Sequence, residues 1–145
     1  MEASLKIRRA RRRDFEQVRT LLGASAPAVR AERKRFRRLV STLREDLYLA
    51  ERERDATVVG LAVVAYARGL GPPTAVIRRL LAPSSTATQL LLDSACARAA
   101  ARGCARIEVQ LDDGSLVEQL RETGWADGPR TLARRVPGPV LEEAS

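Results

Sequence analysis

Six stretches of the chain have the residue pattern of β-strands. In residues 4–9, Leu5 and Ile7 alternate with basic residues, so one face of the strand would lie in a core. Residues 57–67 are apolar at both alternating sets of positions, which is typical of a central strand covered on both faces. The predicted strands are residues 4–9, 47–51, 57–67, 74–82, 105–111 and 131–136.

Four helices are predicted between these strands, each bounded by residues that commonly cap or end helices. The boundaries are Asp14 and Gly23 for the first helix, Ser25 for the second, Gly103 for the third (residues 86–102), and Asp113 or Ser115 for the fourth, which ends at Thr123. The element order predicts an α/β fold with a mixed sheet and helices on both faces. We expect one domain over residues 1–137 and a frayed tail over 138–145.

The composition is typical of a globular protein. The 145 residues are 45% hydrophobic and 30% charged. No apolar run reaches the ~18 residues of a membrane span, and the N-terminus lacks the apolar core of a secretory signal. We therefore expect a cytoplasmic protein without a membrane partner.

The chain contains no histidine. This excludes the Ser-His-Asp and Cys-His forms of nucleophilic catalysis and the usual Cys/His zinc sites, so no metal is expected. Acid–base chemistry would have to use a carboxylate, Tyr, Cys, Lys or bound water. We interpret Cys96 and Cys104 as buried structural thiols, because no histidine is present to activate either one.

The net charge of +8 arises in the N-terminal third, since residues 1–44 alone carry a net charge of +10. One interpretation is a surface for an anionic partner. The other is a solvated helix face in an arginine-rich chain. Aromatic residues make up only 3% of the chain, which argues against a surface that stacks nucleic-acid bases. The candidate partner-binding residues are Arg30, Arg33, Lys34, Arg37 and Arg38.

Several segments, in this order and spacing, resemble the GCN5-related N-acetyltransferase (GNAT) superfamily. They are KIRRARRRDFEQVRTLL, LYLAERERDATVVGLAVVAYA, LLAP followed by LLLDSACARAAARGCARIEVQL, and LVEQLRETGW. The resemblance covers residues 4–136 and implies transfer of an acetyl group from acetyl-CoA to an amine. It also implies that the coenzyme lies in a V between the fourth and fifth strands.

The resemblance places the coenzyme's pyrophosphate at the start of the long helix, where the family has a glycine-rich loop. Here residues 83–89 contain neither Gly nor Arg. Hydroxyl groups could still donate to phosphate, or Ser85 or Thr86 could simply cap the helix. The candidate coenzyme-binding residues are Leu81, Ala82, Ser84, Ser85, Thr86, Ala87 and Thr88. The departure makes acetyl-CoA binding doubtful.

The family's catalytic side chains are also incomplete. Leu120 occupies the position where relatives often place the proton-donating Tyr, and Leu cannot donate a proton. Asp113 replaces an Asn that is frequent there. Glu108 and Glu51 are the candidate general bases, although the pattern favours an exposed strand carboxylate at each position over a base. Arg78 or Arg79 could bind a coenzyme phosphate or an acidic substrate, or form a surface ion pair.

Together these departures predict a degenerate GNAT-like protein that acts by binding a protein partner or a second copy of itself. The first alternative is an active N-acetyltransferase that uses Glu108 or a chain of water molecules as its base. A nucleic-acid-binding module built on residues 30–44 is the second alternative, and it predicts strongly salt-dependent binding.

Overall fold

The computed structural model describes residues 4–23, 29–111, 114–128 and 133–135. Five strands form one sheet in the order β1-β2-β3-β4-β5. Neighbouring strands are antiparallel, except that β4 and β5 run parallel. The strands are β1 (Leu5–Arg9), β2 (Glu45–Arg52), β3 (Val58–Ala67), β4 (Thr74–Leu81) and β5 (Arg106–Val109).

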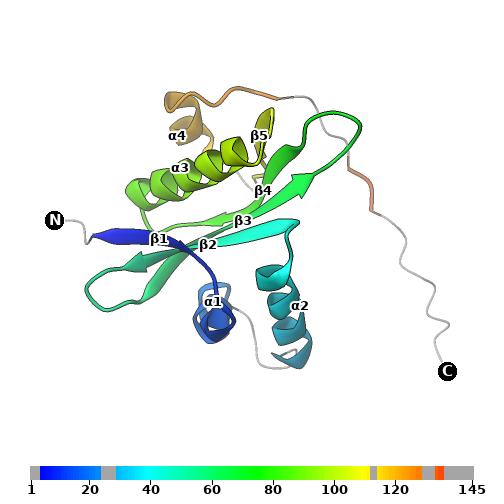
Figure 1. Cartoon of the computed structure of the whole chain (residues 1–145). Coiled ribbons are helices and arrows are strands. Elements are labelled where there is room, and N and C mark those ends of the chain that lie inside the picture. Colours follow the sequence, from blue (N-terminus) through cyan, green and yellow to red (C-terminus); the bar gives the residue numbers. More distant parts are fainter. Residues whose placement is uncertain (1–3, 24–28, 112–113, 129–132, 136–145) are drawn as a thin grey trace.

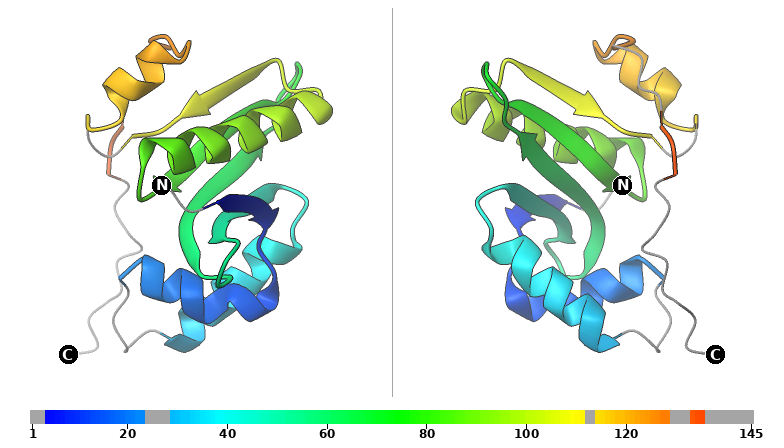
Figure 2. Two further views of the ribbon diagram at one scale, coloured as in Figure 1. Left: turned by 90° about the vertical axis from the view of Figure 1, so that its left-hand side faces the viewer. Right: turned by 90° about the vertical axis from the view of Figure 1, so that its right-hand side faces the viewer.

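Helices cover both faces of this mixed sheet, as the sequence predicts. Helices α1 and α2 lie on one face, and α3 and α4 lie on the other (Figures 1 and 2). The helices are the 3-10 turn η1 (Arg12–Asp14), α1 (Phe15–Leu21), α2 (Val29–Ser41), α3 (Ser85–Ala101) and α4 (Val117–Glu122).

The core consists of two apolar layers separated by the sheet. On β2, Leu47 and Leu49 pack toward α1 and α2, whereas Tyr48 and Ala50 pack toward α3. All four side chains are buried. Thus β2 is covered on both faces like β3, although its sequence predicts only that Leu47 and Leu49 share a face. The central strands therefore contribute side chains to both apolar layers.

Glycines end α3 and α4 in the same way. At α3, Gly103 has φ +77°, its N–H donates to Ala100, and the next N–H, of Cys104, donates to Ala99. At α4, Gly124 has φ +98° and the N–H of Trp125 donates to Leu120. This hydrogen-bond pattern is a Schellman motif, which requires a left-handed residue and therefore favours glycine.

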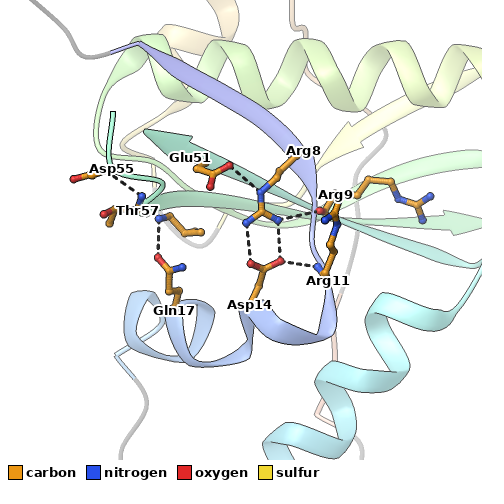
Figure 3. A network of polar contacts seen from close by, with 9 residues as sticks. Arg8, Arg9, Arg11, Asp14, Gln17, Glu51, Asp55 and Thr57 are labelled. Carbon is orange, nitrogen blue, oxygen red and sulfur yellow. Dashed lines mark hydrogen bonds and ion pairs between the residues drawn. The ribbon is translucent and has the colours of Figure 1, made fainter. Parts of the chain in front are cut away.

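A polar network joins β1 to η1 and β2 (Figure 3). Arg8 donates two hydrogen bonds of 2.8 Å to the Asp14 carboxylate and one of 2.9 Å to Glu51. Asp14 also accepts a bond of 2.6 Å from the N–H of Arg11. Asp14 therefore holds the start of η1. The sequence predicts that Asp14 caps α1, but its side chain makes no capping hydrogen bond to that helix. The hydrogen bond from Arg8 lowers the pKa of Asp14.

Some predicted boundaries shift or lie outside the described residues. The fifth strand covers only Arg106–Val109 of the predicted 105–111. Ser25 and Asp113 lie outside the described residues, as does the tail 138–145. Of the predicted strand 131–136, only 133–135 are described, and these have no regular structure. Among the described residues, no helix is long and apolar enough to cross a bilayer.

Candidate functional site

Strands β4 and β5 separate partway along their length. They pair in parallel from Thr74 opposite Arg106 to Ile77 opposite Val109, and the last contact is a 2.9 Å bond from the Gln110 N–H to the Ile77 carbonyl. β4 continues to Leu81, so its residues 78–81 have no partner on β5. Beyond Ile77, β4 therefore has no pairing partner on β5, and we call the place where the two strands diverge the cleft.

A β-bulge explains why the strands separate. Val63 pairs with Arg79 and Val64 with Ile77, which leaves Arg78 as an extra residue in β4. A bulge bends its own strand and increases the local twist. Because it directly follows Ile77, it turns β4 away from β5 where their pairing stops. The sequence does not reveal this extra residue.

Arg78 and Arg79 are both exposed at the bulge. Neither has a carboxylate within 4.0 Å among the described residues, so the predicted surface ion pair is absent there. Arg79 lines a hollow of about 260 Å³ on the α1/α2 face, together with the apolar side chains of Phe15, Leu61 and Val63. The hollow thus combines an apolar floor with a cationic rim.

The connection from β4 to α3 is very short. It contains only Ala82, Pro83 and Ser84. Ser84 caps α3, because its hydroxyl oxygen accepts a 3.1 Å hydrogen bond from the N–H of Ala87. The sequence predicts Ser85 or Thr86 as the cap of this helix. In the structure the cap is Ser84. Pro83 has no N–H to offer an anion.

The other candidate coenzyme residues divide into buried and exposed groups. Leu81 packs with the α1/α2 layer and Ala82 with the α3 layer. Thr88 is 2% exposed and donates its hydroxyl to the Ser84 carbonyl at 3.0 Å. Ser85 and Thr86 are exposed. As the first two residues of α3, they have N–H groups without an intrahelical acceptor.

The structure places no tyrosine at the cleft. Leu120, at the family's usual acid position, is 5% exposed and packs in the α3 layer. The chain has two tyrosines, Tyr48 and Tyr66, and both donate hydrogen bonds to Asp46. Asp46 also pairs with Arg98 and Arg102, which lie near the end of α3 opposite the cleft. No tyrosine hydroxyl is therefore available as a proton donor in the cleft.

The two candidate bases differ in their surroundings. Glu51 accepts a 2.9 Å hydrogen bond from Arg8 and is mostly buried in the polar network. Glu108 is 40% exposed and lies 3.2 Å from Arg106. Glu108 also lines a hollow of about 380 Å³ with Trp125, between β5 and α4. Glu108 is thus the accessible carboxylate, although it is ion-paired.

The candidate partner-binding residues do come together. Arg30, Lys34, Arg37 and Arg38 are exposed on α2. Together with Arg33, and with Arg12 and Ser41, which the sequence reasoning did not include, they line one hollow of about 620 Å³.

Sequence reasoning missed a second polar centre, around Asp46. This carboxylate is fully buried and pairs with Arg9 at 2.7 Å, as well as with two arginines of the α3 region at longer distance. The described residues contain no group of three His, Cys, Asp or Glu side chains that could hold a metal ion. The two cysteines are free and partly buried.

Solved structures share this architecture. A transcriptional regulator from Bacillus halodurans is 19% identical with a TM-score of 0.77, over 92% of this chain and 100% of that one. Glucosamine-6-phosphate N-acetyltransferase from Arabidopsis thaliana is 12% identical with a TM-score of 0.77, over 92% and 99%. An aminoglycoside N-acetyltransferase in complex with CoA is 13% identical with a TM-score of 0.75, over 94% and 97%.

The chain therefore has the GNAT fold, and the resemblance stated from the sequence is confirmed at the level of the fold. No protein-family model matches the chain, and no curated protein is significantly similar to it in sequence.

Proposed function

We propose that this GNAT-fold protein binds acetyl-CoA weakly or not at all and acts by binding a protein partner. The observation that carries the proposal is the three-residue connection before α3. It contains no glycine, and Ser84 uses its own hydroxyl to satisfy the Ala87 N–H.

A diphosphate needs several converging N–H donors and a backbone that it can approach closely. Here Pro83 lacks the donor, Ala87 already has an acceptor, and the N–H of Thr88 donates to the Ser84 carbonyl at 3.0 Å. At this end of α3, the N–H groups of Ser84, Ser85 and Thr86 remain without an acceptor among the described residues. The residues present are therefore a poor fit for the pyrophosphate of CoA.

Isothermal titration with acetyl-CoA and with CoA tests this directly. We expect no saturable heat at coenzyme concentrations up to the millimolar range. A second titration uses Ser84→Gly, which removes the side chain that competes for Ala87. Micromolar binding by the unaltered protein would overturn the proposal, whatever the behaviour of Ser84→Gly.

The alternative function is an active N-acetyltransferase, and one observation favours it. The residues of β4 that lack a β5 partner, 78–81, and the N–H groups of Ser84, Ser85 and Thr86 that lack an acceptor among the described residues lie at the same end of β4. In that case Glu108 would accept the proton of the acceptor amine. Acetylation of an amine panel that falls at least tenfold in Glu108→Gln would support this function. Glu118→Gln is the matched control, because Glu118 is an exposed α4 carboxylate that also lies near an arginine.

A further inference from the structure

The strongest uncompensated charge among the described residues lies on α2 and η1. Basic residues from these two elements line one hollow, and we call five of them the basic face. These five are Arg12 of η1 and Arg30, Lys34, Arg37 and Arg38 of α2. None of them has a carboxylate within 4.0 Å among the described residues.

The acids nearest in the sequence are already paired elsewhere. Glu32, the only acid of α2, accepts a 2.7 Å hydrogen bond from Arg19 on α1. Glu16 pairs with Arg33, whose guanidinium also lies 4.7 Å from the centre of the Phe15 ring. These contacts hold α1 and α2 together, and within the part of the chain that the structure describes they leave the basic face without a paired acid.

This arrangement destabilises α2 by itself. Arg30 and Lys34, and likewise Lys34 and Arg38, stand at i and i+4, where like charges repel along a helix. The helix is kept in place from its other side, where Phe36 is buried and packs against Phe15 at 5.5 Å between ring centroids. An external anion would relieve the repulsion.

The shape and chemistry of the basic face indicate what kind of anion it fits. Its charges follow about two turns of helix, roughly 12 Å, at steps of about 6 Å. An acidic helix with carboxylates at i and i+4 presents charges at that same spacing. Arginine also matches carboxylate geometry through two parallel hydrogen bonds.

Nucleic acid fits less well. The lining of the hollow contains no aromatic side chain on which a base could stack. The phenylalanines beneath it, Phe15 and Phe36, are 5% and 6% exposed. The charged surface is also a hollow between η1 and α2, and a protruding helix would be needed to enter a groove of a duplex.

We infer that the basic face is a docking site for an acidic polypeptide segment that carries Glu or Asp at helical spacing. This inference rests on the partner-binding part of the proposed function. It does not depend on the coenzyme result, because α2 covers the opposite face of the sheet from α3.

Fluorescence anisotropy of the full chain with defined probes tests the inference. The probes are a labelled peptide with Glu at every fourth position, the same peptide with Gln, and a DNA duplex of equal net charge. The test variant combines Arg30→Glu, Lys34→Glu and Arg37→Glu. The control combines Arg54→Glu, Arg68→Glu and Arg134→Glu, which changes the net charge equally at exposed sites away from the basic face. Thermal unfolding checks that the test variant and the control variant are folded. If the test variant is not folded, a variant with Gln at the same three positions replaces it.

We expect the Glu peptide to bind and the Gln peptide not to bind. Affinity should fall as salt rises and by about tenfold or more in the test variant, with a much smaller loss in the control. Absence of binding, or equal loss in both variants, would overturn the inference, since equal loss reports net charge alone. Tighter binding of the duplex than of the Glu peptide would overturn it in favour of nucleic acid.

Discussion

Tyr66 donates a hydrogen bond of 2.5 Å to Asp46, a carboxylate that is wholly enclosed by the protein. The same carboxylate pairs with Arg9 of β1 at 2.7 Å and lies 3.7 Å from Arg98 of α3. Arg102 lies 3.9 Å from it and 4.1 Å from the centre of the Tyr66 ring. One side chain thus ties β1, β2, β3 and the end of α3 together.

Asp46→Asn should strongly destabilise the protein. The change leaves three guanidinium groups close together without their shared counter-charge. The cost should lie below the about 3–5 kcal/mol of a fully buried pair, because Arg9 and Arg98 are 51% and 41% exposed. The free energy of unfolding is measured by urea titration. Asp127→Asn is the control, because Asp127 is 85% exposed and its pair with Arg121 should contribute at most about 1 kcal/mol. Equal midpoints for the two variants would show that Asp46 has no special role.

Both tyrosines should ionise at a higher pH than a free tyrosine. Burial, followed by the hydrogen bond to Asp46, raises the pKa of Tyr66, and burial with the charge of Asp46 raises that of Tyr48. Because both pKa values are raised on folding, the associated stability is complete below the ordinary value of about 10 and is lost as pH rises above it. The ultraviolet absorbance of tyrosinate follows the titration, and Tyr48→Phe isolates Tyr66. A midpoint near 10 in the folded variant would contradict the enclosed geometry.

Acid should weaken the link between β1 and η1. Arg8 lowers the pKa of Asp14 below its ordinary value of 3.8, so the stability from this pair is present above that pH and is lost as pH falls further. We expect the stability difference between the unaltered protein and Asp14→Asn to shrink below pH 4. NMR titration of Asp14 in Arg8→Met should show a higher pKa than in the unaltered protein. An unchanged value would mean that Arg8 does not set it.

Gly60→Ala should disturb the contact between β3 and β4. A Cβ atom at residue 60 would lie 2.8 Å from the backbone carbonyl oxygen of Leu81, and a paired backbone cannot move away without disturbing the sheet. Such overpacking costs about 1–3 kcal/mol. Gly71→Ala is the matched control, since nothing lies within 4 Å of its Cβ position. The melting temperature should fall in the first variant only.

The order of the elements could be predicted because it depends on local patterns. The alternation around Ile7 sets the first strand, and Gly103 ends α3 as predicted because the left-handed turn there favours glycine. The sequence could not distinguish Ser84 from Ser85 as the cap, because residue propensities locate a helix end only to within one or two residues.

The polar centre at Asp46 could not be predicted for a different reason. Its partners lie 37 residues before it and up to 56 after it, and no local pattern joins positions so far apart. The bulge at Arg78 could not be predicted for the same reason, because a bulge is defined only by the register of a strand against its neighbour.

The extra residue belongs to β4 itself, so the gap beside β5 depends on how β4 pairs with β3. Substitutions in the connection 82–84 should therefore leave the separation of the two strands unchanged, because the bulge that accompanies it lies within β4.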